Sequence, residues 1–119
     1  QAVVAEIWGD PPVLDFTATK RLALRAEAHG VQCWLVRRGG HANLSAARER
    51  WRLSSLASLR HPHDSRAPGE GLWQADLFRS RYRPPRRWVA RHDPAGGVVL
   101  DHGRLDLGAD TEVAEARAG

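Results

Sequence analysis

Residues 2–37 read AVVAEIWGDPPVLDFTATKRLALRAEAHGVQCWLVR and determine the architecture. The run at 2–8 is apolar and rich in β-branched residues, and it ends in Gly-Asp-Pro-Pro, which is typical of a buried strand followed by a turn. Residues 15–29 are rich in helix formers, place apolar side chains one turn apart and stop before a glycine, so they predict a helix. The apolar run at 31–37 predicts a second strand.

A strand, a helix and a second strand in this order form a βαβ unit over residues 1–38, so we predict an α/β fold. Its two strands are expected to be parallel, with a right-handed crossover. Asp15 or Thr17 is the expected N-cap of the helix. The run from Cys33 to Val36 does not alternate between apolar and polar residues, which predicts that both faces of its strand are covered.

The chain has 119 residues, enough for one small domain with one modest core. Eighteen basic residues against fourteen acidic ones give a net charge of +4, carried almost entirely by arginine, which hints at an anionic partner. A single cysteine excludes an internal disulfide and favours a reducing cytoplasm. Because the sequence contains no Met, we expect it to be part of a longer protein. No run approaches the length of a membrane span.

The second part of the chain, residues 44–107, predicts an antiparallel extension of the parallel sheet. A turn of helix is expected at 44–48, and an exposed loop, rich in Pro and Gly, at 59–71. Strands are expected at four places, namely 50–58, 72–80, 86–93 and 98–101. The α/β domain fragment is thus predicted to span 1–107, and the polar tail 108–119 to be disordered.

Residues 78–91, FRSRYRPPRRWVAR, contain six arginines and no acid. If the preceding strand continues, alternation places three of these arginines on one face, and two more follow the Pro-Pro turn. We predict a binding surface for a partner or for nucleic acid, made of Arg79, Arg81, Tyr82, Arg83, Arg86 and Arg87. The alternative is a solvated sheet edge whose charge prevents aggregation.

Other candidate residues have structural interpretations. Cys33 lies inside an apolar run and is expected to be a small buried hydrophobe. His61, His63 and Asp64 offer metal-binding atoms but are fewer than a convincing site needs, so we expect no metal. The tryptophans are expected to fill the core, although three of them, at 51, 73 and 88, fit a row across neighbouring strands.

The order of these elements resembles the second half of a RecA-type core. In that family a strand carries the Walker-B acid, a glycine pair leads out of a later strand, and a basic segment ends in proline. Here Glu6 has the position of the acid, and GGHANLSAARERW (39–51) that of the glycine-pair segment. Arg79, Arg81 and Pro85 match the basic segment.

Within that superfamily, residues 1–107 look like the C-terminal half of the ImuA family. The blocks that carry this resemblance are AVVAEIWGDP, the segment from DFTATK to RERWR, HPHDSRAPG, and LWQADLFRSRYRPPRRWVARHD. ImuA proteins are RecA-like accessory proteins of the SOS mutagenesis cassette. The resemblance therefore implies a non-catalytic role, without a cofactor, in error-prone translesion DNA synthesis. The implied protein partners are the Y-family-like ImuB, the C-family mutagenic polymerase and RecA.

The resemblance also implies roles for single residues. Arg79 and Arg81 would contact acidic or phosphate groups of a partner. Glu6 replaces an aspartate and is followed by Ile7 and Trp8, so we interpret it as a vestigial Walker-B position. The counterpart of the loop that touches single-stranded DNA in RecA is shortened here to GGHA (39–42).

Three functional hypotheses follow from the sequence. The first is an interaction module that keeps a RecA-like assembly surface without hydrolysis. The second is a single-stranded DNA-binding module that uses the arginines of residues 79–91 for phosphates and aromatic rings for bases. The third is half of a RecA-type ATPase whose phosphate-binding loop lies upstream.

Overall fold

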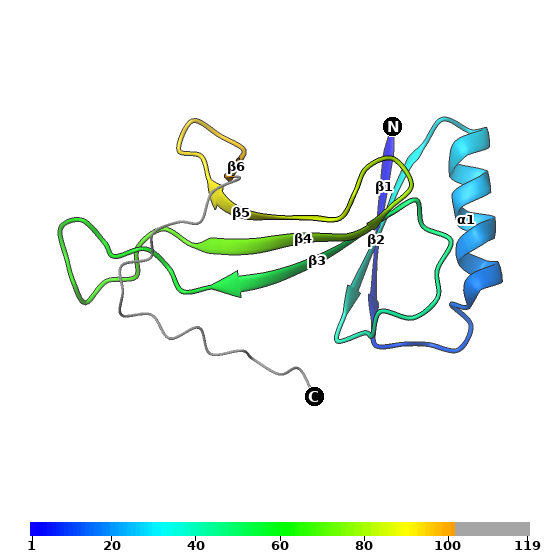
Figure 1. Cartoon of the computed structure of the whole chain (residues 1–119), viewed down its shortest axis with the longest axis horizontal. Coiled ribbons are helices and arrows are strands. Elements are labelled where there is room, and N and C mark those ends of the chain that lie inside the picture. The colour runs from blue at the N-terminus through cyan, green and yellow to red at the C-terminus, as the bar shows by residue number, and fades with distance from the viewer. Residues whose placement is uncertain (102–119) are drawn as a thin grey trace. The chain divides into compact units, whose positions relative to one another are not determined.

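The computed structural model describes residues 1–101 and contains one helix and six strands in that range (Figure 1). In chain order these are β1 (Ala2–Trp8), α1 (Phe16–Ala28), β2 (Gln32–Arg38), β3 (Glu49–Leu56), β4 (Leu72–Ser80), β5 (Arg86–His92) and β6 (Val98–Asp101). β1 and β2 form a two-stranded parallel sheet, and the other four strands form a second sheet in the order β3-β4-β5-β6. The predicted mixture of parallel and antiparallel strands with a helix is confirmed. The prediction that the antiparallel strands extend the parallel sheet is wrong, because within the described residues β3, β4, β5 and β6 hydrogen-bond only among themselves and form a sheet of their own.

The chain divides into two units. The first consists of Gln1–Arg50 together with Ser80–Tyr82, and the second of Trp51–Arg79 together with the residues from Arg83 onward. The predicted tail at 108–119 and the end of the predicted domain at 102–107 lie outside the described residues. No helix within residues 1–101 is long and apolar enough to cross a membrane.

The first unit contains the predicted βαβ arrangement. β1 and β2 are parallel, with a register that runs from Ala2 opposite Gln32 to Trp8 opposite Arg38. The N-cap of α1 is Asp15, whose carboxylate accepts a hydrogen bond from the Ala18 amide at 2.8 Å. This bond satisfies one of the amides that a helix start leaves without a partner, and it decides against Thr17 as the cap.

The predictions that β1 is a buried strand and that β2 is covered on both faces are wrong. Side chains alternate along a strand, so Val4 and Trp34, which are opposite each other in the register, share one face of the sheet. They are 69% and 49% exposed. Cys33, expected to be buried, is exposed as well. The physical reason is that one helix can cover one face of a sheet, whereas a continuous apolar run does not specify how many layers cover it.

The core of the second unit lies on β4 and β5. Its buried side chains are Leu72, Ala75, Leu77, Trp88 and Ala90. Ala75 is opposite Trp88 in the antiparallel register. The Trp88 ring packs against Trp51 with 5.3 Å between ring centroids, whereas Trp73 is exposed. The expectation that tryptophans fill the core therefore holds for Trp88. Of the predicted row of three tryptophans, only Trp51 and Trp88 pack together.

The turn of helix predicted at 44–48 is wrong, because this segment is irregular. Its amides are bound by side chains instead: the Ala46 amide donates to Thr19 Oγ1 at 3.1 Å, and the Ala47 amide donates to Ser45 Oγ at 3.2 Å. Such bonds compete with the helical pattern. The loop predicted at 59–71 is confirmed, with a single isolated bridge between Arg60 and Pro68.

Candidate functional site

All six residues of the predicted arginine-rich surface are exposed. They do not lie on one strand, however, because β4 ends at Ser80. Ser80 Oγ accepts a hydrogen bond from the Tyr82 amide at 3.0 Å, which turns the chain immediately after the strand. The expected alternation of Arg79, Arg81 and Arg83 along one strand face is therefore wrong.

In the second unit the structure brings two of these arginines onto one face. Leu77 is opposite Arg86 in the β4–β5 register, and Arg79 follows Leu77 by two residues, so Arg79 and Arg86 project from the same face. Neither side chain has a hydrogen bond or ion pair within the part of the chain that the structure describes. Arg87 lies on the opposite face, 3.7 Å from the Asp76 carboxylate.

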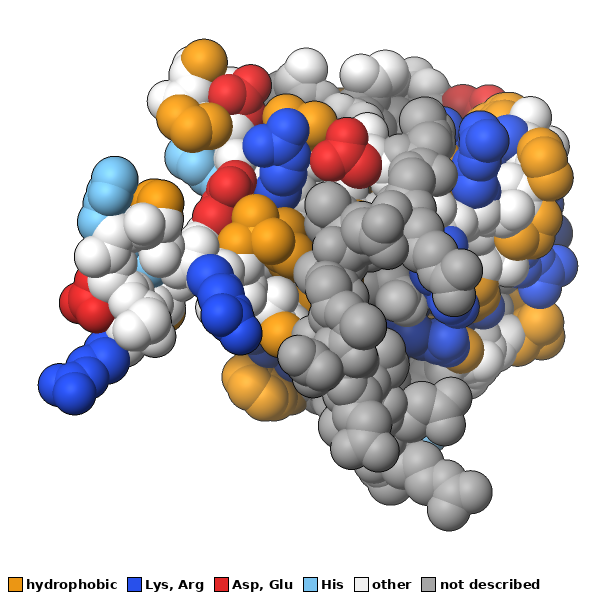
Figure 2. All heavy atoms as spheres, turned by 60° about the vertical axis from the view of Figure 1, so that its left-hand side comes forward, with side chains coloured by type: hydrophobic (Ala, Val, Ile, Leu, Met, Phe, Trp, Pro, Cys, Tyr) orange, Lys and Arg blue, Asp and Glu red, His pale blue; other side chains and the backbone are white. Residues whose placement is uncertain are grey.

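The remaining residues of the predicted surface have local contacts. The Arg83 guanidinium lies 5.5 Å from the centre of the Trp51 ring, a cation–π arrangement. In the first unit, the Tyr82 hydroxyl accepts a hydrogen bond from Arg48 at 3.0 Å, and the Arg81 amide donates to the Arg48 carbonyl. Figure 2 draws one face, on which Lys and Arg side chains stand among hydrophobic and acidic ones.

Glu6, the residue at the Walker-B-like position, forms an ion pair with Arg38 of the neighbouring strand. The Arg38 guanidinium also lies 5.9 Å from the centre of the Trp8 ring. Glu6, Trp8 and Arg38 share the sheet face that α1 does not cover, because alternation and register place them there. The carboxylate of Glu6 is thus partly neutralised by a cation of the same unit.

Sequence reasoning missed a polar cluster where β1 and β2 both end. Asp10 accepts hydrogen bonds from the His41 backbone amide at 3.1 and 3.0 Å, lies 2.8 Å from Nδ1 of the same residue, and pairs with Arg37. A Cβ on Gly40 would lie 3.0 Å from the Asp10 carboxylate, so a glycine suits this close approach. The detectable signal was that Gly-Asp and Gly-Gly-His follow parallel strands, whose ends meet at one sheet edge.

The contacts around Asp10 lower its pKa from the ordinary value. The hydrogen bond from the His41 ring is the largest cause, followed by the His41 backbone amide, with a smaller effect from the Arg37 charge. Because the folded-state pKa is the lower one, ionised Asp10 stabilises the folded chain above the pKa of an unfolded aspartate, about 3.9. This contribution is lost as the pH falls through the folded-state pKa.

Replacing His41 by alanine is expected to raise the pKa of Asp10 toward the ordinary value, because the ring that donates the strongest hydrogen bond is removed. The measurement is an NMR titration of the Asp10 carboxyl carbon between pH 2 and pH 6. His63→Ala, in a different loop, is the control and should leave the titration unchanged. An identical Asp10 titration in His41→Ala would show that the ring does not hold the carboxylate.

A set of apolar side chains on the uncovered face of the first sheet was also missed. We call this set the apolar face; it consists of Val4, Trp8, Trp34 and Val36. All four are exposed, and Trp8 is the most exposed at 74%. The Glu6–Arg38 ion pair lies among them and supplies polar atoms. A contiguous apolar surface with polar groups beside it is typical of a protein interface.

The histidines of the exposed loop have local contacts. His61 Nδ1 accepts hydrogen bonds from the amides of His63 and Asp64 at 3.3 and 3.1 Å. Among residues 1–101, no three His, Cys, Asp or Glu side chains come together as a group that could hold a metal ion.

The chain matches no protein-family model, and comparisons with curated proteins and with solved structures give no match.

Proposed function

We propose that this chain is a RecA-like, non-catalytic accessory protein in SOS-induced, error-prone translesion DNA synthesis. It acts in the cytoplasm through contacts with other proteins. By the family resemblance these partners are the Y-family-like ImuB, the C-family mutagenic polymerase and RecA. In this view the chain corresponds to the C-terminal half of a RecA-like core.

The apolar face is the observation that carries this proposal. Tryptophan is enriched among the residues that dominate binding energy at protein interfaces, and two of the four side chains of the apolar face are tryptophans. Leaving such side chains in water is unfavourable, at about 25 cal/mol for each Å² of apolar surface. A protein partner that covers this surface would recover that free energy. The exposed arginines supply further contacts for acidic groups.

The environment of Glu6 supports a non-catalytic role. An acid that positions a magnesium ion needs its oxygens directed toward the metal or its waters. Glu6 is instead paired with Arg38, whose charge would compete with a cation at that position. The polar cluster around Asp10 likewise uses its carboxylate for contacts with His41 and Arg37.

Replacing Trp34 by glutamate is expected to weaken binding to at least one of the three implied partners by about tenfold or more. The reason is that a charge at the apolar face would be buried without a partner of its own. The measurement is surface plasmon resonance with immobilised wild-type chain or variant, using purified RecA, ImuB-type protein and mutagenic polymerase in turn.

Leu53→Glu is the matched control, because Leu53 is 72% exposed on β3 and lies outside the apolar face. It should bind like the wild type, and circular dichroism should show that both variants fold. The proposal fails if none of the three proteins binds the wild-type chain. It also fails if Trp34→Glu binds as well as Leu53→Glu.

A single-stranded DNA-binding function is the second candidate, and a separate observation favours it. Arg79 and Arg86 share a face of the β4–β5 pair and have no side-chain partner within residues 1–101. Exposed guanidinium groups without an intramolecular partner can donate hydrogen bonds to phosphate oxygens. Salt-dependent binding of single-stranded DNA is the property that separates this function from protein binding.

A further inference from the structure

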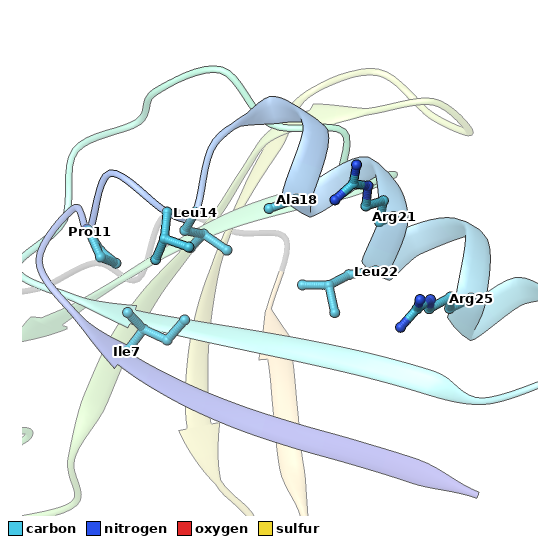
Figure 3. A pocket seen from close by; sticks show the side chains of 8 residues that line it. Ile7, Pro11, Leu14, Ala18, Arg21, Leu22 and Arg25 are labelled. Atoms are coloured by element: carbon cyan, nitrogen blue, oxygen red, sulfur yellow. The ribbon is translucent and has the colours of Figure 1, made fainter.

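A pocket of about 400 Å³ lies between the end of β1, the connection that follows it and helix α1 (Figure 3). Ile7 contributes from the strand, Pro11 and Leu14 from the connection, and Ala18 and Leu22 from the helix. All five are apolar. This volume lies within the range of about 300–1,000 Å³ that is usual for ligand sites.

The pocket follows from where the helix begins. Asp15 caps α1 directly after the connection, so the first turns of the helix carry Ala18 and Leu22, which are four residues apart and therefore lie on one side of the helix. That side is directed toward Ile7 in Figure 3. Val13, which also lines the pocket, is 81% exposed, so the pocket is open and its apolar wall is in contact with water.

Two arginines add positive charge to this apolar pocket. Arg21 and Arg25 also line it and are one helical turn apart. Both are exposed, and neither side chain has an ion pair or hydrogen bond to another described residue. Two guanidinium groups in this arrangement can bind a carboxylate with several charge-assisted hydrogen bonds.

We propose that this pocket binds a peptide segment of a partner protein in which a large apolar side chain stands next to acidic residues. The apolar side chain fills the space between Ile7 and Leu22, and the carboxylates pair with Arg21 and Arg25. A small molecule fits less well, because small ligands usually have 70–90% of their surface buried and this pocket is open. A peptide can continue across the surface beyond the pocket.

This site is separate from the apolar face. Ile7 is an odd-numbered residue of β1, whereas Val4 and Trp8 are even-numbered, so the two surfaces lie on opposite faces of the same sheet. The inference goes beyond the proposed function, because it does not depend on which proteins bind the apolar face.

The test uses a fluorescein-labelled peptide with one Phe between two Glu residues in a Gly-Ser background, and fluorescence polarisation as the readout. Two variants probe the two parts of the site. Ala18→Leu fills the pocket without removing a charge, and Arg21→Glu/Arg25→Glu reverses the charges without filling it. Each variant is expected to weaken binding of the peptide by about tenfold or more.

Lys20→Glu/Arg66→Glu is the matched control, since it makes the same change in net charge at two exposed positions that do not line the pocket. It should bind the peptide as the wild type does. Trp34→Glu, which changes the apolar face, should also bind the peptide as the wild type does. Failure of the peptide-binding proposal and failure of the proposed function can therefore be told apart. Absence of peptide binding to the wild-type chain overturns the inference, as does equal binding of a peptide with Ser in place of Phe.

Discussion

Replacing Trp88 by alanine is expected to lower the free energy of unfolding by about 3–5 kcal/mol, the range seen when large aromatic side chains are removed from cores. Trp88 is 6% exposed, and its ring packs against Trp51. Its removal would leave a cavity beside the buried Ala75, which is opposite Trp88 in the register, and rigid strands cannot fill it. The measurement is urea denaturation at 25 °C, followed by circular dichroism.

Since small domains are stable by about 5–15 kcal/mol, this variant could lose much of its folded population. Trp88→Phe keeps part of the packing and should fall between the wild type and Trp88→Ala, which makes the test usable even when the alanine variant unfolds. Leu53→Ala is the surface control and should change the stability by no more than about 0.5 kcal/mol. A loss below about 1 kcal/mol for Trp88→Ala would contradict the assignment of this core.

The elements that the sequence predicted well are those with strong local signals. The strands at 2–8, 72–80 and 98–101 agree with the observed β1, β4 and β6 at both ends. Gly9 and Asp10 follow β1, Gly69 and Gly71 precede β4, and β-branched residues mark β1 and β6. The helix was also predicted to within one residue at each end, because its cap and the glycine that follows it are local features.

The errors come from contacts between residues far apart in the chain. The segment 44–48 has helix-forming residues, but the hydroxyl of Thr19 on α1 binds the Ala46 amide, and sequence inspection of 44–48 cannot reveal that hydrogen bond. The exposure of Trp34 also depends on contacts between distant parts of the chain, because it is set by how many layers cover the sheet. Burial is a property of the tertiary structure and not of the hydrophobic run itself.

The candidate site was predicted in composition and only partly in arrangement. Sequence reasoning found the exposed arginines, since charge clusters between turn residues are rarely buried. It could not determine which arginines share a face, because this depends on the strand register and on the turn at Ser80 and Tyr82. The register leaves Arg79 and Arg86 together and places Arg87 on the other face.

This arrangement leads to an expected result for DNA binding. In the Arg79→Glu/Arg86→Glu variant, any affinity of the chain for single-stranded DNA should fall by an order of magnitude or more at low salt, because two attractive charges become repulsive. The dependence of log Kobs on log salt concentration should become shallower by about 1.4, since each lost phosphate contact changes the slope by about 0.7. The measurement is fluorescence anisotropy of labelled single-stranded DNA at several salt concentrations.

Arg60→Glu/Arg66→Glu is the matched control, because it makes the same change in charge at two exposed positions of the loop 59–71. If both variants lose the same affinity, the effect reflects net charge and not the pair of arginines on one face. If the wild-type chain binds DNA and only Arg79→Glu/Arg86→Glu loses this affinity, these arginines form a phosphate-binding surface. That result would favour the DNA-binding function over the protein-interaction function. If the wild-type chain shows no salt-dependent binding, the arginines serve a protein partner or solubility, because a phosphate-contacting surface must release counterions.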